Sequence, residues 1–378
     1  MEAMLRLVRE GRARTRGEIG EALSMRSSSV SDLVGELVAA EFLREAVVKP
    51  RGRGRPVGAL SFNAQRLGAI LLTVMDQRIV AQAVDLDYHV LSTIGAEPDT
   101  DADNAMITKT ISRLVREAAG TFPVGIEICA IVASLSGLLD VPRMLWCVSS
   151  RWPRLSNLDL RAALAEFPWP VTMLRNLDAE LAGALLRDGG WAQENVLLLH
   201  WGHGIGASYA ARSGVINLDR GRFCEIGHWQ LGNGRQRPCT CGNLDCLETV
   251  AALWAIGDEI RARFPELPRE ETGLAEALRH VAIAGVPVID DALQHVLRLM
   301  ANLCRLLFPD RVLLTGPFVQ HPEIFRQFVD TLVDAPLMKS LDPVRVATLP
   351  MEQNFERPGA LVQPFSRAIR RHLAGATR

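Results

Sequence analysis

Four potential metal ligands lie within nineteen residues of one loop. They supply one imidazole and three thiolates, from His228, Cys239, Cys241 and Cys246. Soft sulfur donors combined with imidazole suit tetrahedral Zn²⁺ far better than Mg²⁺ or Ca²⁺. Because the protein would fill all four coordination positions, none is left for an activated water. The loop therefore predicts a structural zinc site that shapes a pocket without performing chemistry.

The alternative interpretation is that these cysteines are small buried hydrophobic residues. That interpretation suits Cys129, Cys147 and Cys304, which lie in apolar runs, and it leaves Cys224 undecided. The loop around the cluster is instead rich in Gly, Asn, Arg and Pro, which disfavours an apolar environment. A disulfide framework is disfavoured as well, because the chain has the character of an intracellular protein. Zinc remains the preferred interpretation.

Carboxylates lie where a polar ligand would find partners. Asn176 and Asp178 follow the apolar run 171–174, and ligands of α/β sheets bind at the carboxyl ends of strands. Glu225 and Glu248 flank the metal ligands, so a loop folded around zinc would bring them together. Carboxylates and imidazole are good partners for sugar hydroxyls. For either residue alone, a solvated surface glutamate is the simpler interpretation. For the two together, a shared ligand site is the better one.

A Gly-rich turn follows a second apolar run. Residues 201–206 read Trp-Gly-His-Gly-Ile-Gly directly after the predicted strand 196–201. The backbone N–H groups of such a turn can bind a phosphate, although a tight structural turn explains the same pattern equally well.

Composition excludes several classes of protein. The chain has 378 residues, of which 48% are apolar and 22% charged, which is typical of a globular protein with two or three domains. The first eleven residues are too charged for a signal peptide, and no apolar run approaches the ~20 residues of a membrane span. We therefore expect a cytoplasmic protein.

Charge is unevenly distributed along the chain. Residues 1–66 hold twelve Lys/Arg against eight Asp/Glu, which gives +4, whereas the remainder holds thirty against thirty-five, which gives −5. Only the front end therefore favours a polyanionic partner.

The first 66 residues predict a helix-turn-helix. Apolar spacing predicts a helix over residues 2–10, and Thr15 and Glu18 form a capping box at the start of a second helix. After a short turn, Ser27 or Ser28 can cap a third helix that keeps its small polar residues outside. An ordinary helical subdomain would show the same three helices.

A basic segment after the helices favours DNA binding. Predicted strands over 42–48 and 57–62 flank a Gly/Arg-rich segment, which would form a wing. A small polar helix can enter the major groove, while wing arginines contact phosphate or a narrow minor groove. An Arg-Gly run alone would more often be a solvated linker, but its distance from the helices favours the wing. The expected DNA-binding residues are Arg26, Ser27, Ser28, Ser29, Ser31, Arg51, Arg53 and Arg55.

Beyond residue 66, apolar runs alternate with helical patterns, which predicts α/β architecture with covered sheets. The predicted strands are 68–74, 79–84, 125–133, 171–174, 196–201 and 311–314.

The chain resembles the ROK family, named for repressors, open reading frames and kinases, over nearly its whole length. The motifs that carry the resemblance are Gly54-Arg-Pro56, Gly137-Leu-Leu-Asp140, Asp178-Ala179, Gly202-x-Gly-Ile-Gly206, Glu225-x-Gly-His228, Cys239-x-Cys-Gly-x3-Cys246-Leu-Glu248 and Leu314-x-Gly316. The resemblance implies a winged helix-turn-helix followed by two actin-like, ribonuclease H-like α/β lobes with a structural zinc loop. We expect these units at 1–66, 67–180 and 181–378, with the C-terminal helix returning to the first lobe.

The resemblance also implies roles for individual residues. It matches His228 and the three loop cysteines to zinc ligands. It matches Glu225, His228 and Glu248 to sugar-hydroxyl contacts, and Asp178 to the catalytic base of the family's kinases. Asn176 and Asp178 complete the expected ligand site.

Three departures separate this chain from the kinases of that family. The Asp-x-Gly-x-Thr phosphate loop is missing from residues 68–76, so the phosphates and Mg²⁺ of ATP lack their support in the first lobe. His203 stands where kinases have a threonine hydroxyl, and Leu177 stands where they have an asparagine that would bind sugar. We therefore expect no enzymatic activity, with Asp178 as a vestige of the base.

The sequence thus predicts a transcriptional regulator, in particular a repressor of carbohydrate-metabolism genes. We expect it to bind double-stranded operator DNA as a homodimer, with a tetramer left open, and to respond to a small carbohydrate effector between its lobes. One alternative is a sugar kinase that uses Asp178 as its general base and carries an accessory head. Another is a carbohydrate-binding regulator whose head contacts a protein partner.

Overall fold

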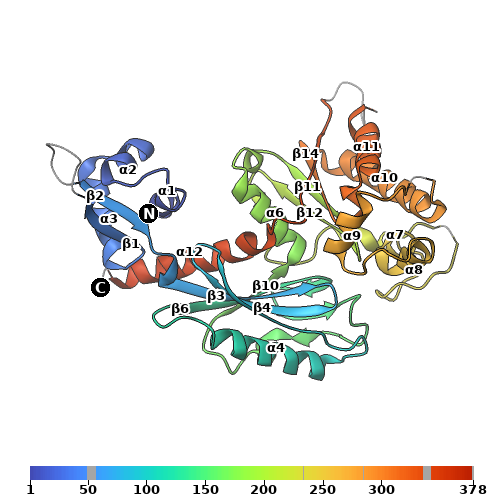
Figure 1. Ribbon diagram of the computed structural model, residues 1–378, viewed down its shortest axis with the longest axis horizontal. Coiled ribbons are helices and arrows are strands. Elements are labelled where there is room, and N and C mark those ends of the chain that lie inside the picture. Colours follow the sequence, from blue (N-terminus) through green and yellow to red (C-terminus); the bar gives the residue numbers. More distant parts are fainter. Residues whose placement is uncertain (49–56, 233, 284, 335–341, 377–378) are drawn as a thin grey trace.

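The computed structural model describes residues 1–48, 57–232, 234–283, 285–334 and 342–376. A small N-terminal unit lies beside one of two larger α/β lobes, and the C-terminal helix runs from between the lobes back to that unit (Figure 1). Both ends of the chain therefore lie at the same end of the molecule (Figure 1).

The N-terminal unit consists of three helices followed by an antiparallel hairpin. The elements are α1 (Glu2–Arg9), α2 (Arg16–Leu23), α3 (Ser27–Ala39), β1 (Leu43–Val48) and β2 (Val57–Phe62). The predicted helices and strands are confirmed. Thr15 caps α2 by accepting a hydrogen bond from the Glu18 N–H at 3.2 Å. The Glu18 carboxylate accepts from the Arg14 N–H, so the reciprocal half of the capping box falls one residue early.

The prediction that Ser27 or Ser28 caps α3 is wrong. Ser24 ends α2 in the left-handed conformation, with its N–H bonded back into that helix. Only Met25 and Arg26 then remain as linker, so Ser27 is already helical. Arg26 occupies the N-cap position in an extended conformation, and its side chain makes no cap hydrogen bond.

The first lobe is built on a five-stranded sheet in the order β10-β6-β3-β4-β5. Its strands are β3 (Leu67–Met75), β4 (Arg78–Asp85), β5 (Val90–Ala96), β6 (Glu127–Leu135) and β10 (Val171–Arg175). Helix α4 (Asn104–Ala119) covers one face with an apolar stripe, as its 3.6-residue spacing requires (Figure 1). A smaller antiparallel sheet and a short helix lie beside it, formed by β7 (Leu138–Asp140), β8 (Leu145–Val148), β9 (Leu158–Asp159) and α5 (Leu160–Ala163).

The second lobe has a five-stranded sheet in the order β13-β12-β11-β14-β15. Its strands are β11 (Val196–Trp201), β12 (Ile205–Ala211), β13 (Gly214–Val215), β14 (Arg311–Thr315) and β15 (Arg345–Thr348). Its helices are α7 (Glu248–Ala251), α8 (Leu253–Arg263), α9 (Glu271–Leu278), α10 (Pro287–Leu307) and α11 (Pro322–Val329), with a π-helical segment over Asp330–Asp334. All six strands predicted in the body are confirmed, with bounds shifted by at most two residues.

Two helices join the parts of the molecule. Helix α6 (Asn176–Arg187) follows β10 and packs on β12, and α12 (Glu356–Ala376) lies along α6 and along β3 and β6 of the first sheet. The contact is close because glycines stand at it: a Cβ at Gly359 would lie 1.8 Å from the carbonyl oxygen of Ala179. Glycine is therefore required there.

The far end of α12 carries the N-terminal unit. The rings of Phe42 and His372 meet edge to face with centroids 5.9 Å apart, and Glu127 binds both His372 and Arg66. The buried residues of the N-terminal unit and of α12 belong to one apolar core. The unit is therefore packed on the body and not merely tethered to it.

Candidate metal and ligand sites

The four predicted metal ligands lie together. Nδ1 of His228 is 3.5 Å from Sγ of Cys239, and Sγ of Cys241 is 3.6 Å from Sγ of Cys246. All four ligand atoms lie within 4.8 Å of one another. In a tetrahedral Zn²⁺ site, bonds of about 2.3 Å to sulfur and 2.0–2.1 Å to nitrogen place ligand atoms roughly 3.5–3.8 Å apart. The donor set and its spacing therefore fit zinc.

The peptide around this cluster is already folded to present the ligands. The Cys239 N–H donates to the Asn243 carbonyl, and the Asn243 amide donates to Sγ of Cys241 at 3.4 Å. Isolated β-bridges pair Gln230 with Cys246 and join the two sides of the loop. The undecided Cys224 lies outside the cluster, because it packs against the core of the second lobe.

His228 belongs to a short 3-10 turn (Ile226–His228) that is pressed against the rest of the site. A Cβ at Gly227 would lie 2.3 Å from the Ile205 carbonyl oxygen and 2.8 Å from the Glu248 carboxylate. The close approach explains why glycine must stand between Glu225 and His228. Because Nδ1 of His228 faces the metal position, Nε2 is the nitrogen that could bind a second partner.

Two carboxylates of the predicted ligand site flank a buried arginine. Arg175 Nη1 lies 3.6 Å from Asp178 Oδ1, and Arg175 Nε lies 3.5 Å from Glu225 Oε1. Arg175 also donates to the carbonyl oxygens of Phe223 and Ala207, which fixes its orientation. The sequence analysis missed Arg175; its only signal was a charged residue at the end of an apolar strand.

Each of these carboxylates has one buried oxygen that accepts no hydrogen bond from the described residues. Ser208 donates to Oδ1 of Asp178 at 2.7 Å, but Oδ2 is buried without a partner among the described residues. Glu225 Oε1 is buried without a hydrogen bond as well, although it lies near Arg175. Burial raises the pKa of both carboxyls, against the opposing charge of Arg175. Buried acceptors without partners are costly, so a bound hydroxyl group would stabilise both.

Glu248 is held more completely than Glu225. One oxygen accepts from the Ile205 N–H at 2.9 Å, and the other accepts from the Trp254 indole N–H at 3.2 Å. Glu225 lies close enough to His228, Glu248 and Asp178 for their charges to act on its pKa. The structure thus brings together four of the five predicted ligand residues.

Asn176 and Leu177 differ in their surroundings. Asn176 is the first residue of α6, two positions before Asp178, and is half-buried. Leu177 is buried in an apolar cluster with residues of β11 and β14, and a Cβ at Gly206 would lie 2.6 Å from its side chain. Leucine at this position therefore adds to the core beneath β12.

The predicted DNA-binding residues of α3 are accessible. Arg26, Ser27, Ser28, Ser29 and Ser31 are all exposed, while α3 buries Val30, Val34 and Leu37 on its opposite face. The wing residues Arg51, Arg53 and Arg55 lie outside the described residues.

One side chain holds the three elements of the N-terminal unit in register. Arg16 on α2 donates to the Ser31 carbonyl oxygen on α3 at 2.8 Å and forms two hydrogen bonds with the Glu45 carboxylate on β1. This arrangement fixes α3 relative to the hairpin.

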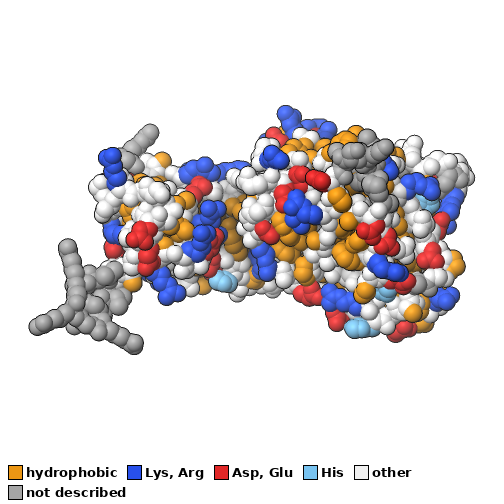
Figure 2. Space-filling model, turned by 90° about the horizontal axis from the view of Figure 1, so that it is seen from above, with side chains coloured by type: hydrophobic (Ala, Val, Ile, Leu, Met, Phe, Trp, Pro, Cys, Tyr) orange, Lys and Arg blue, Asp and Glu red, His pale blue; other side chains and the backbone are white. Residues whose placement is uncertain are grey.

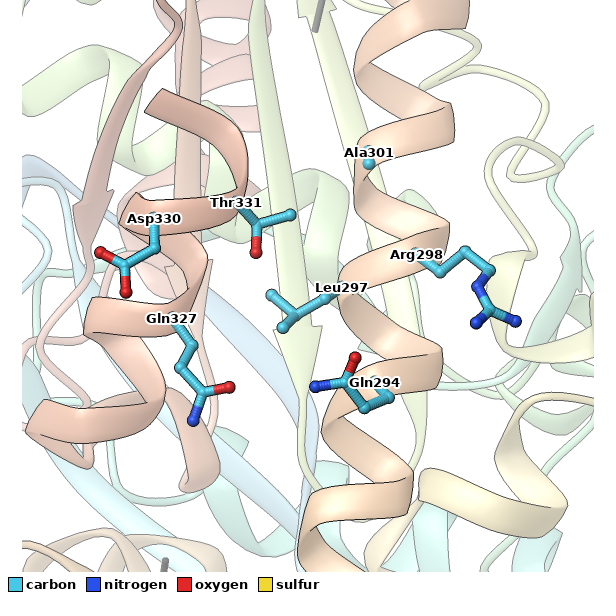
Figure 3. A pocket seen from close by; sticks show the side chains of 7 residues that line it. All are labelled: Gln294, Leu297, Arg298, Ala301, Gln327, Asp330 and Thr331. Atoms are coloured by element: carbon cyan, nitrogen blue, oxygen red, sulfur yellow. The ribbon is translucent and has the colours of Figure 1, made fainter. Parts of the chain in front are cut away.

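The other surfaces of the molecule show no comparable concentration of predicted site residues among the described residues. Basic and acidic side chains are interspersed over the face shown in Figure 2, in keeping with a net charge of −1. A hollow of about 320 Å³ lies between α10 and the end of α11 with the π-helical segment, where Leu297 of α10 faces Gln327 and Thr331 (Figure 3). It contains none of the predicted site residues. Among the described residues, no helix has the length and apolar character needed to cross a bilayer.

A two-lobed α/β protein with a Cys₃His loop beside buried carboxylates is the class that this fold and site define. A model described as the ROK family matches residues 76–357. The chain belongs to the ROK family.

Its relatives include regulators and kinases. The DNA-binding transcriptional repressor Mlc of Escherichia coli is 21% identical over 332 residues, which are 85% of this chain and 82% of Mlc. A ROK family transcriptional regulator, described as a homologue of the E. coli MLC protein, superposes with a TM-score of 0.71 at 19% identity and covers 98% of this chain and 96% of its own. The ROK hexokinase of Thermus thermophilus superposes with a TM-score of 0.57 at 20% identity, and the match covers 80% of this chain and 99% of the hexokinase. The fold of the whole chain is thus found in a regulator.

Proposed function

We propose that this chain is a DNA-binding transcriptional repressor of carbohydrate-metabolism genes, controlled by a sugar that binds beside the metal loop. One observation carries the proposal: an exposed polar helix, fixed by Arg16 next to a hairpin, precedes a ROK domain that lacks the kinase phosphate loop. Similarity to the repressor Mlc over 85% of the chain supports it. The inferred units are a winged helix-turn-helix at 1–66 and two lobes at 67–180 and 181–378.

The charge of the N-terminal unit supports a role for the wing. Residues 1–48 hold seven arginines against eight acidic residues, which gives −1, and residue 66 adds one arginine. The segment 49–55 adds four further basic residues and no acidic one, which brings residues 1–66 to +4. The whole positive excess of the unit therefore belongs to the wing, where it would meet DNA phosphates.

The metal we assign to the loop is Zn²⁺ in a structural role. Cys239, Cys241, Cys246 and Nδ1 of His228 would fill a tetrahedral site. Asp178, Glu225, Glu248 and Nε2 of His228 would bind sugar hydroxyls, with Asn176 at the rim. The two buried oxygens that accept no hydrogen bond, one on Asp178 and one on Glu225, favour a ligand that donates hydrogen bonds.

Regulation would follow from two-fold symmetry. A homodimer would place two α3 helices on half-sites related by the same symmetry as the operator. The sugar can release DNA only if it binds more tightly to a conformation whose helix spacing fails to match the operator. The coupling free energy expected for such a regulator is about 1–3 kcal/mol.

The test begins with operator fragments selected from a random duplex pool by the purified full chain. Replacing Arg53 and Arg55 with Ala should weaken binding by about tenfold or more at 0.15 M salt and lower the slope of log K against log salt by about 2, because two phosphate contacts are lost. Fluorescence anisotropy across a salt series measures both.

The matched control removes two exposed arginines from α4, by Arg113→Ala and Arg116→Ala, which changes the total charge equally. The control should bind like the wild type. Equal binding by the wing variant and the control would reject the wing. Sugar-dependent ATP turnover in a coupled assay, lost in Asp178→Asn, would instead identify a kinase.

A further inference from the structure

The Gly-rich turn between β11 and β12, which could cradle a phosphate, contacts an acidic side chain of the same chain. Glu271, the first residue of α9, accepts a hydrogen bond from the His203 N–H in the middle of the turn. A Cβ at Gly202 would lie 2.8 Å from Glu271 Oε1. The carboxylate therefore lies directly against the backbone of the turn, at a place that only glycine permits.

Two cationic side chains complete the surroundings of this carboxylate. Nε2 of His200 lies 3.4 Å from one oxygen, and Nη2 of Arg151 lies 3.8 Å from the other. The side chains of His200, Arg151 and Glu271 are only 20%, 12% and 13% exposed. An N–H group of a Gly-rich turn, an arginine and an imidazole are the groups that proteins use to bind phosphate.

The titration of these groups agrees with a bound carboxylate. Burial alone would raise the pKa of Glu271, but His200, Arg151 and the His203 N–H lower it to about 2. Burial alone would lower the pKa of His200, but Glu271 and Glu180 raise it. Glu271 is therefore an anion at neutral pH, and the protonated form of His200 is favoured.

Glu271 also reaches the other lobe. Its backbone N–H donates to Oδ1 of Asp76 at 3.0 Å, and Asp76 lies in the β3–β4 turn of the first lobe. Arg151 belongs to the first lobe as well. Glu271 thus joins the β11–β12 turn of the second lobe to the β3–β4 turn of the first lobe.

We propose that the turn around His203, with His200 and Arg151, is an anion-binding site whose occupant is the carboxylate of Glu271. The internal carboxylate takes the place of a phosphate group and links the two lobes. While it is bound, nucleotides and phosphorylated sugars are excluded from the turn. Resting on the proposed function, the effector is then an unphosphorylated sugar, bound on the metal side of the domain.

The proposal is tested by emptying the site in the full-length protein. Calorimetric titration with inorganic phosphate, at constant ionic strength, should show binding by Glu271→Ala that is at least about tenfold tighter than binding by the wild type. That factor corresponds to one or more charge-assisted hydrogen bonds gained from Arg151 and the turn. Acetate should compete with phosphate in this variant.

The matched control is Glu276→Gln, which removes an exposed carboxylate from the same helix and should leave phosphate binding unchanged. A folded Glu271→Ala protein with the phosphate affinity of this control would overturn the proposal. If Glu271→Ala does not fold, Glu271→Gln keeps the size of the side chain and should still gain phosphate affinity. Wild-type behaviour of that variant would overturn the proposal equally.

The effector class has its own test. In a thermal-shift panel of neutral sugars and their phosphates, only neutral sugars should stabilise the wild-type protein, whereas stabilisation by the phosphates alone would overturn this assignment. Phosphate titration involves neither DNA nor sugar. Failure of the proposed repressor function would therefore leave its result intact, and failure here would leave DNA binding intact.

Discussion

Buried carboxylates have different surroundings on the two sides of the ROK domain, near the metal loop and near the Gly-rich turn between β11 and β12. On the metal side, Asp178 and Glu225 each have one buried oxygen that accepts no hydrogen bond among the described residues, although Arg175 lies near both carboxylates. On the side of the Gly-rich turn, Glu271 meets the His203 N–H, His200 and Arg151. The metal side therefore leaves acceptors for a ligand, whereas on the other side the groups that face Glu271 are already paired, and only Nε2 of His203 is buried there without a hydrogen bond among the described residues.

This difference supports the proposal that the ROK domain binds a sugar and transfers no phosphate. Buried polar groups without partners are costly, so a site that keeps them is maintained for something that binds. Groups that are fully paired gain little from a new ligand. The comparison predicts sugar binding without phosphate transfer, and each side can be changed separately.

The largest effect is expected from removing a metal ligand. Cys246→Ser leaves three ligands on a loop that the metal would hold together, so we expect loss of bound zinc, loss of sugar binding, and a decrease of about 3 kcal/mol or more in the free energy of unfolding. Plasma mass spectrometry measures the zinc content, and urea unfolding measures the stability.

Cys147→Ser is the control for that variant, because Cys147 is half-buried and lies outside the cluster. It should keep one zinc per chain. If Cys246→Ser retained full zinc occupancy, the assignment of the ligands would be wrong.

A smaller effect is expected at Asp178, where one substitution should raise the stability of the protein and weaken its sugar binding. Burial raises the pKa of this carboxyl, so Asp178→Asn removes a poorly solvated charge and should stabilise the ligand-free protein by about 1 kcal/mol. The same change should weaken sugar binding by roughly tenfold, since a charged acceptor is lost. Thermal denaturation and calorimetry measure the two effects.

Asp258→Asn provides the comparison for Asp178→Asn, because the Asp258 side chain is 94% exposed. It should change neither quantity. An Asp178→Asn protein that binds sugar as the wild type does would remove Asp178 from the ligand site.

An effect that depends on pH is expected at Glu356, the first residue of α12. Burial raises the pKa of Glu356 to about 8, although Ser134 donates a hydrogen bond to it at 2.6 Å. The folded protein thus holds this proton more tightly than the unfolded chain does. The resulting stability is complete below about pH 4.5 and is lost as the pH rises through 8.

Glu356→Gln should remove this dependence. Relative to the wild type, we expect its free energy of unfolding to rise by on the order of a few kcal/mol between pH 5 and pH 9. Urea unfolding at both values measures the difference. An identical pH profile for the two proteins would show that Glu356 titrates normally.

Much of the fold could be predicted because its signals are local. β3, β6 and β11 are buried along most of their length, and their uninterrupted apolar runs predict them directly. Strands as short as β9 and β13, with two residues each, carry no periodic pattern, so they could not be predicted.

The same distinction applies to the sites. The metal ligands could be predicted because four soft donors and a polar loop lie within one short stretch. Arg175 was missed because a single charge at the end of an apolar strand has no distinctive pattern. Glu271 was missed because its partner Asp76 lies 195 positions away, so that only the tertiary structure brings the two together. The cap of α3 was misplaced by one or two residues because the preceding turn is unusually short.

The seam between α6 and α12 has a mechanical consequence. Gly359 of α12 lies against Ala179, the residue next to Asp178. Near the other end of the same helix, His372 packs against Phe42 of the N-terminal unit. About 20 Å of helix separates Gly359 from His372, so a tilt of about 5° at Gly359 would move His372 by roughly 2 Å. A small shift of α6 beside Asp178 would thereby displace the N-terminal unit far enough to misalign the two α3 helices of a dimer with the major grooves of the operator.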